Sequence, residues 1–279
     1  MKLYTIDTGF FKLDGGAMFG VVPKSIWNKL NPADENNMCT WAMRCLLVEN
    51  AGHLTLIDCG IGNKQDEKFF SYYYLHGEDS LEKSLHRYGF TAEDVTDVIL
   101  THLHFDHCGG AVKRSSDGRL EPTFPRARYW SNRAHWQWAS NPNLREKASF
   151  LKENFAPLKE WGQIYWCEDG QEVTPGVSVK FFYGHTEAQM IPYIQIGTKT
   201  LVYCADLIPS SAHIKPAYIM AYDVRPLVSL EEREDFVEKA VANKYILFFE
   251  HDPRYACGIL TQKDDRLEGK FFVHLEEVL

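Results

Sequence analysis

The sequence lacks the features that mark secreted and membrane-spanning proteins. It has 7 cysteines among 279 residues, an odd number with no CxxC pair, so we expect a reducing compartment and no disulfide framework. No apolar run approaches the roughly 18 residues of a transmembrane helix. The first residues contain no apolar segment typical of a signal peptide. We therefore expect a cytoplasmic protein with no membrane partner.

Positive charge is also scarce. The chain has 30 lysines and arginines against 38 aspartates and glutamates, a net charge of −8, which argues against a nucleic-acid partner. Apolar side chains, in contrast, make up 45% of the residues, enough to form a large core. Because no segment resembles a linker or an internal repeat, we expect residues 1–279 to form a single domain.

Short runs of apolar, β-branched and aromatic residues alternate with segments in which apolar residues recur at helical spacing. The expected strands are 17–22, 41–48, 54–57, 98–100, 177–183, 193–196, 200–204 and 245–249. The expected helices are 78–86, 132–139, 144–158 and 230–242. This alternation in both halves of the chain predicts an α/β fold with layered packing.

The segment HLHFDH, residues 102–107, places four candidate metal ligands directly after an expected strand. His102 and His104 are two positions apart and share one face of an extended chain. Asp106 and His107 follow where a turn can direct them to a second point nearby. Since zinc and similar divalent ions bind imidazole and carboxylate groups, the segment predicts a metal site.

Three later residues, His185, Asp206 and His251, each follow the end of an expected strand. Taken singly, each is more typical of a cap or turn. Because residues at strand ends gather along one edge of a sheet, however, we expect them to join the HLHFDH segment.

Together these residues resemble the metallo-β-lactamase-fold hydrolases, and most of all the branch of the N-acyl-homoserine lactonases. Leu56-Ile57-Asp58-Cys59-Gly60 is similar to the strand and turn that come earlier in that family. The resemblance implies an αββα sandwich, in which two packed mixed β-sheets are flanked by helices and metal ions lie at one edge.

The resemblance also implies a role for each residue of the site. Two divalent ions, expected to be zinc, would be bound by His102, His104 and His185 at one position and by Asp106, His107 and His251 at the other, with Asp206 bridging them. Asp58 would hold a ligand from behind through a hydrogen bond, although a plain turn residue is the alternative. Asp106 would be catalytic, because it can aim the bridging hydroxide at a carbonyl and return a proton to the leaving group. Two dications against two ligand carboxylates predict an electropositive pocket.

The substrate-binding residues are less constrained by the sequence. Residues 15–27 resemble the loop that lactonase-like members fold over their metals, which makes Met18, Phe19 and Trp27 candidates. His213 is a further candidate. Ordinary core packing, an exposed loop histidine and a homodimer interface are the alternatives. Pro209 stands where the lactonases often have a tyrosine that contacts the substrate.

The function predicted from these residues is hydrolysis of a small-molecule lactone or related ester by a dinuclear metal centre. N-acyl-homoserine lactones, and hence quorum quenching, are one form of it. A phosphotriesterase-like or glyoxalase-II-like thioester hydrolase would use the same metals and remains open. A nuclease is disfavoured by the net charge, and a non-catalytic binding module by the complete ligand set.

Overall fold

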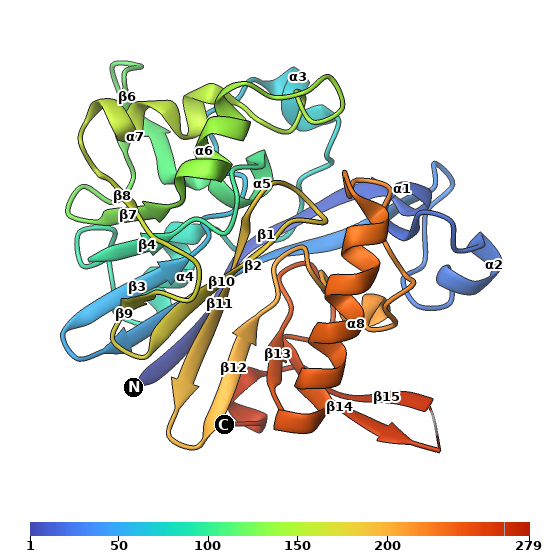
Figure 1. Ribbon diagram of the computed structural model, residues 1–279. Helices are drawn as coiled ribbons and strands as arrows, with labels where there is room; N and C mark the ends of the chain where they lie inside the picture. The colour runs from blue at the N-terminus through green and yellow to red at the C-terminus, as the bar shows by residue number, and fades with distance from the viewer. Residues whose placement is uncertain (265) are drawn as a thin grey trace.

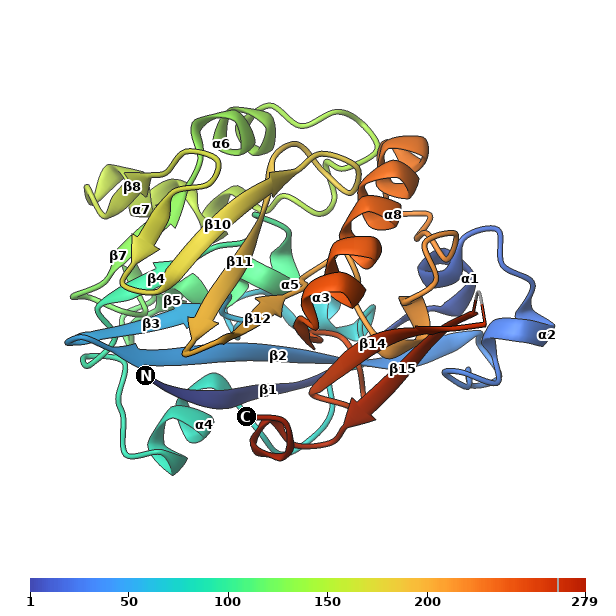
Figure 2. The ribbon, with the colours of Figure 1, turned by 60° about the horizontal axis from the view of Figure 1, so that its bottom comes forward.

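The computed structural model describes residues 1–264 and 266–279. Its two β-sheets pack face to face with helices on their outer sides (Figure 1), which confirms the predicted αββα fold. Figure 2 shows β1 and β2 running beneath β10–β12, with α4 (Leu81–Arg87) on the outer side of the first sheet and the long α8 (Pro226–Asn243) beside the second. Within the described residues, no helix combines the length and apolar character needed to cross a bilayer.

Each sheet is mixed. The six-stranded sheet runs in the order β1 (Lys2–Asp14), β2 (Met38–Asn50), β3 (His53–Ile57), β4 (Asp97–Ile99), β7 (Arg128–Ser131) and β8 (Ile164–Trp166). The seven-stranded sheet runs in the order β15 (Arg266–Phe272), β14 (Cys257–Lys263), β13 (Ile246–Phe248), β12 (Lys199–Tyr203), β11 (Gln189–Ile196), β10 (Val177–Phe182) and β9 (Glu172–Thr174). A small separate hairpin joins β5 (Val112–Arg114) to β6 (Leu120–Pro122). The remaining helices are α1 (Gly15–Phe19), α2 (Lys24–Trp27), α3 (Glu67–Ser71), α5 (Phe105–Cys108), α6 (Arg133–Ser140) and α7 (Ala156–Glu160), with 3-10 turns at Gly109–Ala111, Lys152–Asn154, Ser211–His213 and Leu275–Glu277.

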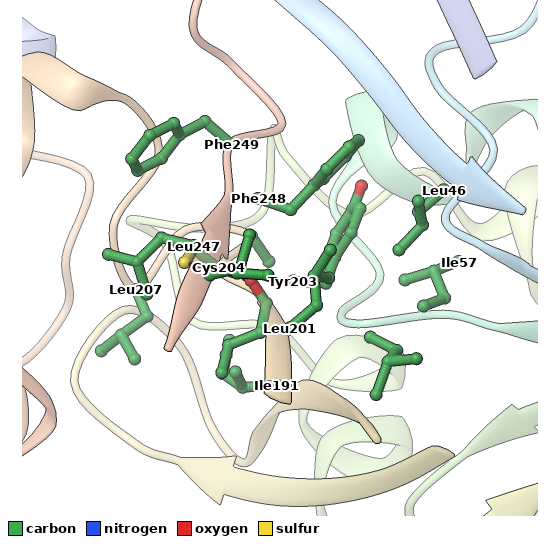
Figure 3. Packing of buried hydrophobic residues seen from close by; sticks show 14 of the residues in the cluster. Leu46, Ile57, Ile191, Leu201, Tyr203, Cys204, Leu207, Leu247, Phe248 and Phe249 are labelled. Atoms are coloured by element: carbon green, nitrogen blue, oxygen red, sulfur yellow. Dashed lines mark hydrogen bonds between the residues drawn. The ribbon is translucent and has the colours of Figure 1, made fainter. Parts of the chain in front are cut away.

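The main core lies between the two sheets. Leu46 and Ile57 of the first sheet pack with Leu201, Tyr203 and other buried residues of the second (Figure 3). The Tyr203 hydroxyl donates a 2.9 Å hydrogen bond to a backbone carbonyl of β2, so this buried phenol is satisfied across the interface. This rigid interface fixes the edge where the strand ends meet.

Two predicted elements are wrong. Residues 17–22 were expected as a strand, but the Asp14 side chain accepts a 2.8 Å hydrogen bond from the Ala17 backbone and starts α1 there, which ends at Gly20 with φ 56°. Residues 144–158 were expected as one helix. They form turns, a 3-10 turn and then the short α7, because Asn143 and the buried Glu146 hold the chain in local turns.

Candidate metal centre

The HLHFDH segment leaves β4 as extended chain and enters α5 at Phe105. The expected turn is therefore the first turn of α5, which carries Asp106 and His107. Gly109 and Gly110 come next in the chain. Glycine is required there because this region packs closely against the loop after β3. A Cβ atom at Gly109 would lie 2.1 Å from the carbonyl oxygen of Ile61, so no other residue fits without a backbone shift.

The other sheet supplies the remaining candidate ligands. His185 follows β10, Asp206 follows β12 and His251 follows β13. All three side chains are buried at the sheet edge that faces α5. The structure thus brings all seven predicted ligands together from both sheets.

The first group comprises His102, His104, His185 and Asp206. Nδ1 of His104 lies 3.0 Å from His102 Nε2 and 3.3 Å from His185 Nε2. Oδ2 of Asp206 lies 3.0 Å from His185 Nε2 and 3.5 Å from His102 Nε2. Four donor atoms therefore face one common point.

The second group comprises Asp106, His107 and His251. The two imidazole Nε2 atoms are 3.2 Å apart, and Asp106 Oδ2 lies 3.7 Å from His107 Nε2 and 3.8 Å from His251 Nε2. Asp206 reaches this group too, since its Oδ1 is 3.1 Å from His251 Nε2. Asp206 therefore lies against both groups, as a bridging ligand would.

Spacing and chemistry both fit divalent metal ions. Zinc–nitrogen bonds of about 2.0–2.1 Å in a tetrahedron place neighbouring ligand nitrogens about 3.3 Å apart. The separations of 3.0 and 3.3 Å around His104 are close to that value. Asp206 Oδ1 is buried and forms no hydrogen bond of good geometry among the described residues, as expected of an oxygen whose partner is a metal.

His107 is oriented by two buried acids. Its Nδ1 lies 3.1 Å from Asp58 Oδ2 and 3.1 Å from Glu250 Oε2. Asp58 also accepts hydrogen bonds from the Thr101 backbone (2.8 Å) and hydroxyl (2.6 Å), which fixes its carboxylate. Burial raises the pKa of Glu250 above its usual range. Asp58 therefore lies where the resemblance placed it, and sequence reasoning missed Glu250.

His104 faces another buried acid, Glu146, which sequence reasoning also missed. Its Nε2 points toward Glu146 Oε1 at 3.7 Å, and the same oxygen accepts a 2.6 Å hydrogen bond from the Thr186 hydroxyl. Burial alone would raise the pKa of Glu146, but the nearby His104 imidazole and the hydrogen bond from the Thr186 hydroxyl outweigh it and lower that pKa to about 2.

His135 supports the backbone of the HLHFDH segment. Its Nε2 accepts a 2.8 Å hydrogen bond from the backbone N–H of Leu103, and its Nδ1 lies 2.6 Å from the Glu187 carbonyl oxygen. Burial lowers the pKa of His135 to about 3, so the ring is neutral and can act as that acceptor. These contacts fix the backbone at Leu103, between the two ligands His102 and His104.

Asp223 holds His185 through a 2.9 Å contact between Oδ1 and Nδ1. We expect Asp223→Asn to weaken metal binding by about 10–100-fold, because the amide no longer orients and polarises this imidazole. Competition with a chromophoric chelator measures the affinity without any assay of activity. Asp235→Asn, on the exposed side of α8, is the matched control. Unchanged affinity in Asp223→Asn would show that this contact does not orient the ligand.

Two of the ligands, His185 and His251, are protonated when metal is absent. Burial alone would lower the pKa values of His185 and His251, but the Asp206 carboxylate outweighs burial and raises them to about 10 and about 9. Metal binding at this site must therefore release protons.

The charge expected for the pocket needs correction. The carboxyl groups of Asp58, Glu146 and Asp223 surround the ligands in addition to Asp106 and Asp206. Their negative charge offsets the positive charge of two dications. A charge balance that counts only Asp106 and Asp206 therefore overstates the positive potential of the pocket.

A cavity of about 370 Å³ borders both groups. Besides ligand residues, its lining includes Leu13, Met18, Tyr73, Phe105, Arg145, Met220 and Tyr222. Burial, followed by the charge of Asp106, raises the pKa of Tyr73 to about 12. The pKa of Tyr222 is also raised, chiefly by burial. Pro209 uses its carbonyl oxygen to accept a 3.0 Å hydrogen bond from the His251 backbone.

Of the four residues predicted to contact the substrate, one lines this cavity. Met18 lines the cavity, whereas Phe19, Trp27 and His213 are buried behind it. Phe19 stacks between Trp27 (5.3 Å between ring centroids) and His213 (4.5 Å). His213 Nε2 lies 2.9 Å from the Met18 carbonyl oxygen, and its Nδ1 lies 2.7 Å from the Ser210 hydroxyl. These three residues therefore position Met18, because their own rings are already packed or hydrogen-bonded.

An αββα sandwich with adjoining histidine and aspartate groups at the edge of both sheets defines a metal-dependent hydrolase. The chain belongs to the metallo-beta-lactamase superfamily, whose family model matches residues 44–251. The predicted family and enzyme class are thus confirmed.

Relatives agree with this assignment. The chain is 25% identical over 264 residues to the N-acyl homoserine lactonase AiiA of Bacillus thuringiensis subsp. kurstaki, covering 90% of this chain and 93% of AiiA. A probable metal-dependent hydrolase from Staphylococcus aureus has a similar structure (TM-score 0.90, 28% identity, 98% of this chain and 97% of that one). AidC, a dizinc quorum-quenching lactonase, shares the fold (TM-score 0.80, 21% identity, 96% and 93%).

Proposed function

We propose that this chain hydrolyses lactones or closely related carboxylic esters with two divalent ions, expected to be zinc. The observation that carries the proposal is Asp206, whose two oxygens face both ligand groups at one cavity. The similarity to an N-acyl homoserine lactonase over 90% of the chain supports the lactone substrate. Action on such lactones would make this a quorum-quenching enzyme.

Bound here, the two ions would supply a hydroxide at neutral pH and polarise the carbonyl that it attacks. Asp106 borders the cavity, so its carboxylate can accept a proton from the attacking water and deliver it to the leaving oxygen. Tyr73 and Tyr222 keep their protons because their pKa values are raised, and each can donate a hydrogen bond to the substrate.

A substrate panel on the metal-loaded enzyme tests the function. We expect kcat/KM for an N-acyl lactone to exceed the values for a hydroxyacyl-glutathione thioester and an aryl phosphotriester. A tenfold or greater preference for the thioester or the phosphotriester would overturn the lactone assignment while leaving the hydrolase class intact.

A further inference from the structure

Arg145 lines the cavity but takes no part in the chemistry described above. It lies in the turns that follow α6, next to Glu146. The two neighbours differ in their surroundings, since Glu146 is buried against His104 whereas Arg145 is exposed at the cavity.

The guanidinium of Arg145 is only partly satisfied by the protein. Its Nη2 donates to the backbone carbonyl oxygens of Ala221 and Asp223 (3.4 Å for the latter). Among the described residues, no acceptor is within hydrogen-bonding reach of its Nε or Nη1, and no carboxylate lies within 4.0 Å. Arg114 and Arg225, in contrast, pair with Glu153 at 3.0 Å and Glu187 at 2.6 Å.

This arrangement leaves N–H donors available beside the site of hydrolysis. Each free N–H group of a guanidinium can donate a charge-assisted hydrogen bond to a carboxylate oxygen. The cavity also has apolar walls, such as Leu13 and Met220, that suit a hydrocarbon segment. The acids around the ligands limit the positive charge of the metals, so Arg145 is a further source of attraction for an anion.

We propose that Arg145 determines specificity by binding a carboxylate that the substrate carries at a distance from its scissile bond. The substrate class is then an ester or lactone with an apolar segment ending in a carboxylate. This inference rests on the proposed function, because it assigns the substrate of that same site.

Arg145 also has a structural role, since its contacts with Ala221 and Asp223 join two walls of the cavity. Loss of that tie would affect charged and uncharged substrates alike. A role in recognition would affect only the charged ones, so the ratio between them separates the two roles.

The test compares 4-nitrophenyl hydrogen adipate, which ends in a carboxylate, with its methyl-capped neutral counterpart. We expect Arg145→Met to lower the ratio of kcat/KM values, anionic over neutral, by about tenfold, as for the loss of a charge-assisted hydrogen bond. Arg145→Lys should recover part of the ratio. Arg126→Met removes the same charge from an exposed site outside the cavity and should leave the ratio unchanged.

Calorimetric binding of the corresponding non-hydrolysable amides, one anionic and one neutral, gives a second readout. Arg145→Met should weaken the anionic amide about tenfold more than the neutral one. An unchanged ratio in both assays overturns the role of Arg145. Absence of turnover with either ester, together with selective loss of anion binding, would overturn the proposed esterase function and leave the carboxylate site standing.

Discussion

Asp106→Asn is expected to lower kcat/KM for the lactone by about 10²–10⁴-fold, the range for loss of a proton-transferring group. Asp106 borders the cavity, and its Oδ2 lies 3.7 Å from His107 Nε2 and 3.8 Å from His251 Nε2. An amide can neither accept the proton of the attacking water nor supply the ligand charge. Steady-state kinetics on metal-loaded protein, with metal content determined by mass spectrometry, measure the effect.

Metal content decides how the Asp106→Asn result is interpreted. Full metal content with low activity would point to proton transfer, whereas loss of one ion would point to ligation. Asp117→Asn, in an exposed turn, is the matched control and should retain wild-type kinetics. Near-normal kcat/KM in Asp106→Asn would exclude both roles.

Removal of the metals by a chelator is expected to abolish hydrolysis and lower the thermal midpoint by about 10 °C. Ligands at about 1,000 times their Kd stabilise the folded state by about 4 kcal/mol. In a domain of this size each kcal/mol corresponds to about 2–4 °C. The apoprotein should stay folded, because protons on His185 and His251 then balance the buried Asp206 carboxylate. Calorimetry with and without chelator measures the shift.

Readdition of zinc should restore both the midpoint and the activity. Asp206→Asn provides the control, because without the shared carboxylate its midpoint should respond less to metal. A midpoint of wild-type protein that is the same with and without chelator would contradict a site in which metal binds the native state.

The metal ligands are predictable because the patterns that indicate them, a cluster of ligand residues and a position directly after a strand, are local in the sequence. Four lie in one hexapeptide after an apolar run, and the others each follow a run of strand-forming residues. Strand β1 was not among the expected strands, because polar residues interrupt its apolar positions and leave no continuous apolar run. The error over residues 17–22 has a related cause, since short apolar runs suit a buried helix and a strand equally well.

The acids behind the ligands could not be found in the same way. Glu146 and Asp223 come from irregular loops, and only tertiary contacts with His104 and His185 give them a role. Glu250 did leave a signal, because a charged residue follows directly after a buried apolar strand and precedes a candidate ligand. The segment 144–158 shows the same limit, since burial of Glu146 overrides helical spacing.

The division of the ligands between the two sheets has a consequence for biosynthesis. The first group is complete only once Asp206 has been synthesised, and the second only once His251 has been. At roughly 5–20 residues per second, the ribosome adds residues 207–251, 45 residues in all, in a few seconds. A nascent chain can therefore assemble the first group before the second, and a polypeptide truncated ahead of His251 would lack a complete second group.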